Sequence, residues 1–219
     1  MKHLRPALLL TVFFVVLTGL VFPGVVWAFG KVFFPHQAAG SLVVDAKGNV
    51  VGSELLGQPF SKPEYFHPRP SAAGSGYDAA NSSGTNLGPT SDKLVNGVKD
   101  DPATKDADES YSGFGDLARA YRAENGLDAD ATIPADAATR SSSGLDPDIS
   151  PGNAALQVAR VAKARGVSAE KVQALVAQQT TGRALGVIGE PHVNVLKLNM
   201  DLDALSERQV QAAPNPGRA

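Results

Sequence analysis

The 219-residue chain contains no cysteine, which excludes disulfides, thiolate metal sites and cysteine nucleophiles. Charge is absent from one segment: no Asp, Glu, Lys or Arg stands between Pro6 and Gly30. The formal net charge is -2, and the residues after Asp45 are mildly acidic. They lack the clustered Lys and Arg that bind a phosphate backbone, so we set nucleic acid aside as a partner.

The sequence also lacks the motifs of nucleotide and metal chemistry. There is no Gly-x-x-x-x-Gly-Lys-Ser/Thr loop for phosphates and no Asp-Lys-Thr-Gly-Thr string for a phosphoaspartate. Ser168-Ala-Glu-Lys171 matches Ser-x-x-Lys without the companion motifs of penicillin-recognising enzymes, so we interpret Ser168 as a helix cap. The four histidines are scattered and have no acidic partner at ligand spacing. We expect no catalytic residue, no metal site and no tightly bound cofactor.

The uncharged N-terminal segment is long enough to span a membrane. Its apolar part runs from Leu8 to Phe29, and a bilayer core of about 30 Å takes roughly 20 helical residues. Lys2, His3 and Arg5 precede the segment, whereas Lys31 follows it. The positive-inside rule therefore places the N-terminus in the cytoplasm and the rest of the chain outside.

A cleaved signal peptide is the alternative for this segment, because Val26-Trp27-Ala28 matches a cleavage site. The chain would then be an exported binding protein or hydrolase. The apolar stretch is longer than the roughly 7 to 15 residues of a signal peptide, which favours a retained helix. We predict a transmembrane helix with a short cytoplasmic start in residues 1–36, an extracytoplasmic mixed α/β domain in 37–205 and a flexible tail in 206–219.

The first half of this domain is predicted to be poor in regular structure. Two β-branched runs around Lys47-Gly48-Asn49 predict a β-hairpin over residues 41–53. The Gly-, Ser-, Pro- and Asn-rich stretch from Gln58 to Thr90 predicts a long loop of the kind that is functional or disordered. The acidic run over residues 100–109 lacks the central glycine of a calcium-binding loop, so we interpret it as a solvated loop.

Helices are predicted in the second half. Helix formers predict a short helix over residues 117–125, which a glycine ends. Ser150 as N-cap, with proline at the next position, predicts a helix that ends at Gly166. Apolar residues spaced by three and four after Ser168 predict another that ends near Gly182. The two would form an αα-hairpin with a very short connection.

Two features of this half leave alternatives open. The loop Ser141–Pro151 runs into a helix N-terminus, where it is either a phosphate site or a structured loop that positions the helix. Gln157 on that helix is either an exposed helix former or a contact residue.

The C-terminal part is predicted to end in a strand. The run His192–Met200 is β-rich and predicts a largely buried strand with a bulge, because its alternation changes phase between Val195 and Leu196. The tail from Ser206 is expected to be frayed.

Several separate strings occur in one order along the chain, after the N-terminal span. They are Gly52-Ser-Glu-Leu-Leu-Gly-Gln-Pro-Phe60, Tyr65-Phe-His-Pro-Arg-Pro-Ser71, Ser82-Ser-Gly-Thr-Asn-Leu-Gly-Pro89, Ser143-Gly-Leu-Asp-Pro-Asp-Ile-Ser-Pro151, Gln157-Val-Ala-Arg-Val-Ala162 and Gly189-Glu-Pro-His-Val-Asn-Val-Leu196. In this order the chain resembles the KdpC family, the small subunit of the bacterial Kdp potassium-transporting ATPase.

The resemblance implies a non-catalytic accessory subunit in the bacterial inner membrane. The implied partners are an ATP-hydrolysing P-type subunit, a potassium-selective pore subunit and a small single-span peptide; ATP, Mg and K ions act in the complex. Family members are described as catalytic chaperones that assist assembly and raise the ATP affinity of the hydrolysing subunit. Because the body is predicted to lie outside the membrane, such an effect has to reach the nucleotide by coupling between sites.

The resemblance also marks site residues, which we expect in docking loops rather than in a catalytic centre. Gln157 is the candidate nucleotide contact. The docking-loop candidates come from three of the strings: Arg69, Pro70, Ser71, Asn86, Leu87, Gly144, Leu145, Asp146 and Pro147.

Overall fold

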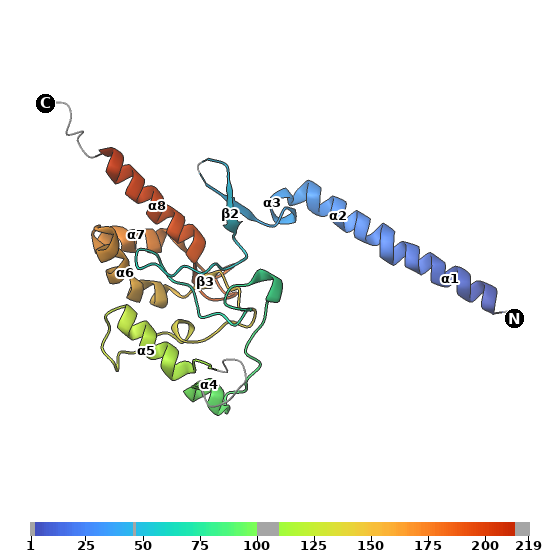
Figure 1. Ribbon diagram of the computed structural model, residues 1–219. Helices are drawn as coiled ribbons and strands as arrows, with labels where there is room; N and C mark the ends of the chain where they lie inside the picture. The colour runs from blue at the N-terminus through green and yellow to red at the C-terminus, as the bar shows by residue number, and fades with distance from the viewer. Residues whose placement is uncertain (1–2, 46, 100–109, 213–219) are drawn as a thin grey trace. The chain divides into compact units, whose positions relative to one another are not determined.

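The computed structural model describes residues 3–45, 47–99 and 110–212, which divide into two compact units, Met1–Ser53 and Glu54–Ala219 (Figure 1). The acidic run predicted as a solvated loop, residues 100–109, lies outside the described residues. The predicted boundaries at residues 36 and 205 stay predictions.

One long helix dominates the first unit. It consists of α1 (Leu4–Val16), the π-helical turn η1 (Leu17–Val21) and α2 (Phe22–Phe33), and it runs unbroken over 30 residues. At 1.5 Å per residue it is about 45 Å long, which exceeds the hydrocarbon thickness of a bilayer. None of its apolar residues is buried within the protein. This helix contains the predicted span Leu8–Phe29, and it is the one candidate span among the described residues.

The π-helical turn lies next to a proline. Pro23 has no N–H, so the carbonyl of Gly19 loses its regular helical donor. Within the same turn the Thr18 hydroxyl donates a hydrogen bond of 2.7 Å to the carbonyl of Phe14. The middle of the span is thus irregular, and π-turns of this kind are frequent at functional positions.

The predicted hairpin follows this helix and a short turn, α3 (Pro35–Ala38). Strands β1 (Leu42–Val44) and β2 (Val50–Ser53) pair in antiparallel fashion, with Leu42 opposite Ser53. The carboxylate of Asp45 accepts hydrogen bonds from the backbone of Lys47 and Asn49 and so fixes the turn. The hairpin prediction is confirmed.

Three helices and a small sheet form the core of the second unit. The helices are α6 (Pro151–Arg165), α7 (Ala169–Gln179) and α8 (Val195–Ala212), and α7 packs against both others (Figure 1). Strands β3 (Asp148–Ile149), β5 (His192–Asn194) and β4 (Thr180–Thr181) form an antiparallel sheet in the order β3-β5-β4. The buried core residues are Phe66, Ile149, Ala154, Val158, Val161, Ala162, Val172, Val176, Val193, Val195, Leu198 and Leu202.

The remaining elements are short. They are the 3₁₀ turns η2 (Ala79–Asn81) and η3 (Ala135–Ala137) and the helices α4 (Asp92–Asn96) and α5 (Phe114–Glu124). Helix α5 is the one predicted from Leu117, and it begins one turn earlier because the carboxylate of Asp116 accepts the Gly113 N–H. The stretch from Gln58 to Thr90 is irregular apart from η2, as predicted.

The ends of α6 match the predicted caps. The Ser150 hydroxyl accepts the Asn153 N–H at 3.1 Å, and Gly166 ends the helix in the left-handed conformation with φ +65°. Ser168 precedes α7 at the N-cap position, but its side chain accepts no capping hydrogen bond, so its predicted capping role is wrong in that respect.

The predicted strand over residues 192–200 is wrong beyond Asn194. Strand β5 ends there and α8 begins at Val195, because Val195, Leu198 and Leu202 are buried at helical spacing. The Asn194 side chain accepts the N–H of Lys197 and starts the first turn. The phase change in the sequence marks a change of element and not a bulge. Helix α8 continues past Ser206, where the tail is predicted to start, and ends at Ala212.

Candidate functional site

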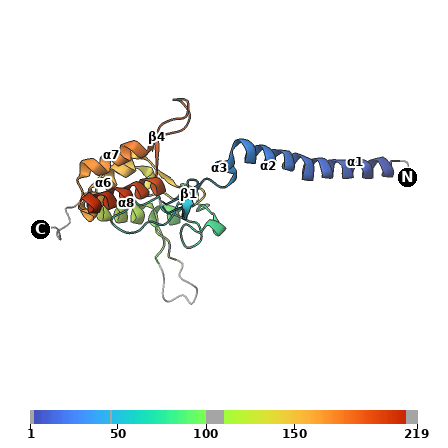
Figure 2. The ribbon, with the colours of Figure 1, turned by 90° about the horizontal axis from the view of Figure 1, so that it is seen from above.

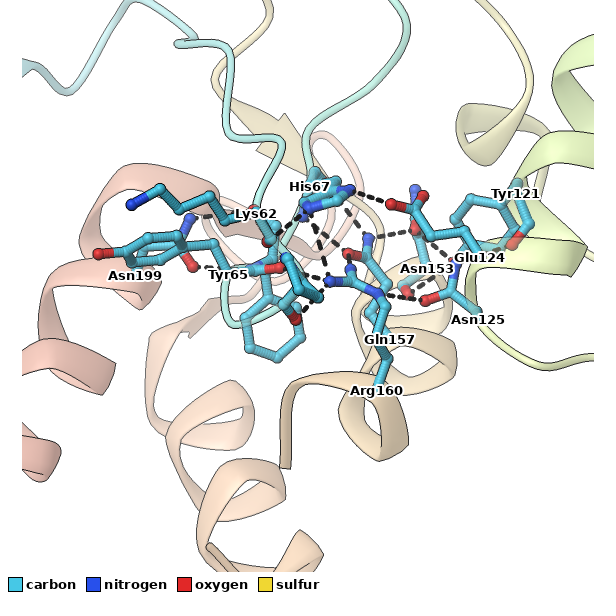
Figure 3. A network of polar contacts seen from close by, with 12 residues as sticks. Lys62, Tyr65, His67, Tyr121, Glu124, Asn125, Asn153, Gln157, Arg160 and Asn199 are labelled. Carbon is cyan, nitrogen blue, oxygen red and sulfur yellow. Dashed lines mark hydrogen bonds and ion pairs between the residues drawn. The ribbon is translucent and has the colours of Figure 1, made fainter. Parts of the chain in front are cut away.

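Gln157 lies in the interior of the second unit, with only 1% of its surface exposed. Its Oε1 accepts hydrogen bonds from the backbone N–H of His67 at 2.7 Å and from Arg160 at 2.7 Å. Its Nε2 donates to the His67 carbonyl at 3.0 Å and to Oδ1 of Asn153 at 2.9 Å (Figure 3). The side-chain amide thus uses both donors and both lone pairs. The interpretation of Gln157 as an exposed helix former is wrong.

Asn199 on α8 binds the backbone of the preceding loop residue, Phe66, in the same way. Its Oδ1 accepts the Phe66 N–H at 2.8 Å and its Nδ2 donates to the Phe66 carbonyl at 3.0 Å. Neighbouring residues of an extended chain direct their backbone groups to opposite sides. Consequently Phe66 is held by α8 and His67 by α6, and the irregular loop is fixed without belonging to a sheet.

The imidazole of His67 connects this loop to the end of α5. Its Nδ1 lies 2.8 Å from Oε1 of Glu124, and its Nε2 lies 2.8 Å from the carbonyl of Lys62 (Figure 3). Both ring nitrogens therefore face oxygen acceptors, and Nη1 of Arg160 also lies 3.5 Å from Nε2. The hydrogen bond from His67, together with the charges of His67 and Arg160, lowers the pKa of Glu124 against the opposing effect of burial.

Arg160 completes the polar network. Its guanidinium donates to the carbonyls of Pro63 and Tyr65 at 2.7 and 2.9 Å, to Oδ1 of Asn125 at 3.0 Å and to Gln157. Burial lowers the pKa of this guanidinium, but an arginine in a protein stays charged. Arg160 thus joins α6, the end of α5 and the loop. The network is a framework that holds the backbone of this loop in position.

The N-terminus of α6 already holds a carboxylate of the same chain. Asp136 accepts hydrogen bonds from the Ser150 N–H at 2.8 Å, the Ser150 hydroxyl at 2.9 Å and Nδ2 of Asn153 at 3.0 Å. A carboxylate at this position satisfies the helix donors and dipole that would attract an anion. The geometry therefore favours the structured loop over the phosphate site. No sequence pattern indicates Asp136, which lies 14 residues before its partner Ser150.

Two of the predicted docking loops pack directly on each other. The Arg69 guanidinium forms an ion pair of 2.7 Å with Asp146, and the Ser71 hydroxyl donates to the carbonyl of Gly144 at 2.7 Å. Gly144 has φ +69°, and a Cβ there would lie 2.6 Å from the backbone nitrogen of Ala73. Only glycine fits this crossing of two loops.

The remaining docking candidates lie around this crossing at different depths. Leu145 is buried, whereas Pro70 and Pro147 are half-buried. Asn86 is exposed with φ +51° and Leu87 is half-buried. The loop carrying these two joins the crossing through the Ser83 N–H, which donates to the Ser143 carbonyl at 3.0 Å. The structure therefore brings the three candidate loops together, and Gln157 lies inside the framework behind them.

The cleft between the network and this crossing is apolar and aromatic for the most part. It has a volume of about 340 Å³, and Phe60, His67, Tyr77, Tyr121 and Glu124 contribute to its wall. The Tyr77 hydroxyl donates to the carbonyl of Arg69, and burial raises the pKa of this phenol. Across residues 3–45, 47–99 and 110–212 no three His, Asp or Glu side chains are grouped to hold a metal ion.

Comparison with known proteins assigns the sequence to a family. A family model described as KdpC, the c chain of a K+-transporting ATPase, matches residues 4–204. The chain belongs to the KdpC family. Chains named potassium-transporting ATPase KdpC subunit are similar to it over nearly their whole length. That of Caulobacter sp. strain K31 is 52% identical over 204 residues, 93% of this chain and 94% of the relative.

Other bacteria carry similar KdpC chains. The KdpC subunit of Koribacter versatilis is 46% identical over 215 residues, 98% of both chains. That of Mycobacterium tuberculosis strain H37Ra is 48% identical over 204 residues, 93% of this chain and 99% of the relative. The resemblance inferred from the ordered strings is thereby confirmed. The alternative of an exported binding protein or hydrolase receives no support, and the KdpC match includes the long apolar helix.

Proposed function

We propose that this KdpC chain is a non-catalytic subunit that docks on the other subunits of the potassium-transporting ATPase and stabilises the assembled pump. The observation that carries the proposal is the crossing of the candidate loops, which the buried amides of Gln157 and Asn199 and the Arg69–Asp146 ion pair hold in place. A surface whose loops are already ordered loses little conformational entropy on binding. Its partners are the ATP-hydrolysing P-type subunit, the potassium-selective pore subunit and a small single-span subunit.

The orientation is part of the proposal. Lys2, His3 and Arg5 precede the span Leu8–Phe29, which places its N-terminus in the cytoplasm of the inner membrane. Trp27 and the phenylalanines near Phe33 then lie at the outer interface, as aromatic side chains do in membrane proteins. The body after this helix is extracytoplasmic.

The effect on ATP follows as indirect coupling. The body is on the opposite side of the membrane from cytoplasmic ATP, and the amide of Gln157 has all its hydrogen bonds within the chain. If the docked subunit favours the pump conformation that holds ATP, it raises ATP affinity without touching the nucleotide. Typical couplings of this kind are about 1–3 kcal/mol, or about 5- to 150-fold in affinity.

Kinetics of the pump with and without this chain test the proposal. Removing the chain from a complex assembled in membranes should lower the apparent ATP affinity of potassium-stimulated hydrolysis within the range above, and adding back the wild-type chain should restore it. The purified full-length chain in detergent should show no saturable ATP isotherm by calorimetry. A micromolar isotherm for the chain alone would contradict indirect coupling, and unchanged pump kinetics would contradict an effect on ATP altogether.

A further inference from the structure

A hairpin projects from the second unit between β4 and β5. Figure 2 shows this segment, which begins at β4, extending away from α6, α7 and α8. Near its end Ala184 and Ile188 pair through two backbone hydrogen bonds, of 2.8 and 2.9 Å. We call Leu185, Val187 and Ile188 the apolar tip. None of these three residues belongs to a motif or to a docking candidate named above.

The apolar tip is unusually exposed. Leu185 is 91% exposed, Val187 76% and Ile188 60%. Leu185 and Val187 are more exposed than any other large apolar side chain of the described residues, including those of the membrane helix. Isolated apolar residues on a surface are ordinary, but contiguous ones at the end of a projection mark an interaction site.

The backbone of the projection is fixed although its side chains contact little. Leu185 has φ +53° and Gly186 has φ +76°, and the left-handed conformation is unfavourable for leucine. The guanidinium of Arg183 binds both carboxylate oxygens of Glu190 at 2.8 Å, which closes the base of the hairpin. A strained and exposed conformation that is held in this way is preorganised for a partner.

The composition of the projection favours protein over lipid as that partner. Segments that insert into a membrane surface carry aromatic residues or unpaired Lys and Arg beside their apolar side chains. Residues 181–190 contain no aromatic residue and no Lys, and Arg183 is paired with Glu190. The projection is thus electrically neutral with a purely aliphatic end, which suits a dry apolar pocket.

We propose that the apolar tip inserts into an apolar pocket on the extracytoplasmic face of another subunit of the potassium-transporting ATPase. This inference rests on the proposed function, since it takes the docking role and the orientation of the body from there. It adds a docking element that lies apart from the crossing of the candidate loops and contacts its partner through aliphatic side chains.

Copurification of the whole complex tests the inference. The tagged full-length chain is expressed with the other ATPase subunits, and the recovery of each subunit from mild detergent is measured by quantitative mass spectrometry. Leu185→Ser, Val187→Ser and Ile188→Ser combined should lower this recovery by about tenfold or more, as loss of a central apolar anchor does. The control variant, Val95→Ser with Val98→Ser, alters exposed apolar residues elsewhere and should leave recovery unchanged.

Crosslinking identifies what the tip contacts. With p-benzoylphenylalanine in place of Leu185, irradiation of membranes should yield an adduct with another ATPase subunit. An adduct with lipid alone would overturn the inference and assign the tip to the membrane surface. Wild-type recovery by the triple variant would overturn it while the proposed function stands. If the wild-type chain itself recovers no other subunit, both proposals fall.

Discussion

At the scale of single residues, the long loop of this KdpC chain is ordered by side-chain amides. Gln157 and Asn199 each bind the N–H and the carbonyl of one loop residue, His67 and Phe66 respectively. These contacts join positions 90 and 133 residues apart in the sequence. A helix pattern predicts that Gln157 lies on α6, but no local signal indicates that its side chain faces a distant backbone. The sequence therefore leaves open whether Gln157 is an exposed helix former or a contact residue.

We expect Gln157→Ala to lower the free energy of unfolding by about 1–3 kcal/mol, because the backbone N–H and carbonyl of His67 lose buried partners. Urea unfolding of the purified full-length chain measures this. Gln173→Ala, at an exposed position of α7, is the matched control and should change stability by less than about 0.5 kcal/mol. Equal stability of the two variants would show that the amide does not hold the loop.

The contact between Glu124 and His67 predicts a pH dependence of stability. The hydrogen bond from His67 holds the pKa of Glu124 below its ordinary value of 4.5. A carboxylate with a lowered folded pKa stabilises the protein above its unfolded pKa, and this contribution is lost as the pH falls through the folded pKa. The stability difference between wild type and Glu124→Gln should therefore shrink as the pH is lowered from 7 to about 3.

Unfolding series at several pH values measure this difference. Asp130→Asn, at an exposed position with no ion pair among those described, serves as the control. Because the Glu124 side chain is 41% exposed, solvent screens the pair and the effect is modest. A difference that stays constant across the series would show that the pair contributes nothing to folding.

At the scale of secondary-structure elements, local chemistry predicted some boundaries and missed others. Ser150, Pro151 and Gly166 set the ends of α6 as expected, because capping depends on neighbouring residues alone. The run after His192 does not distinguish a strand from a helix, because Val and Leu suit both a buried strand and a buried helix. Burial against α7 decides for the helix from Val195 onward, and a sequence pattern does not contain that contact.

Leu198→Ala should lower the free energy of unfolding by about 2–5 kcal/mol, since Leu198 is fully buried in the helical core and its loss leaves a cavity. Urea unfolding measures this. Val187→Ala at the exposed hairpin is the control, expected within about 0.5 kcal/mol of wild type. A small effect at Leu198 would contradict the packing of α8.

The span Leu8–Phe29 is expected to bind other helices as well as lipid. Lipid provides no apolar driving force between helices, so close contact depends on small and hydroxylated residues such as Thr11, Thr18, Gly19 and Gly24. Replacing the span with poly-Leu should weaken copurification of the other subunits. A poly-Leu span that retains these four residues should recover part of the loss. Full recovery by poly-Leu alone would make the span a simple anchor.

At the scale of the whole molecule, the family and the presence of a long apolar helix could be predicted from the sequence. The ordered strings identify the family because their combination is far more specific than any one motif. The long helix could be predicted because the length of the apolar run matches the thickness of a bilayer. The candidate loops could be named but not their mutual contacts. The crossing of Arg69 and Ser71 with Asp146 and Gly144 depends on tertiary structure.

The side of the membrane on which the body lies is the central claim, because indirect coupling to ATP and docking from outside both depend on it. The chain has no cysteine, so single cysteines report the orientation without background. Lys171→Cys places a thiol at an exposed position of α7, and His3→Cys places one before the long helix. In intact spheroplasts a membrane-impermeant maleimide should label Lys171→Cys and leave His3→Cys unlabelled until lysis. Labelling of His3→Cys in intact spheroplasts, with Lys171→Cys reacting only after lysis, would contradict the account.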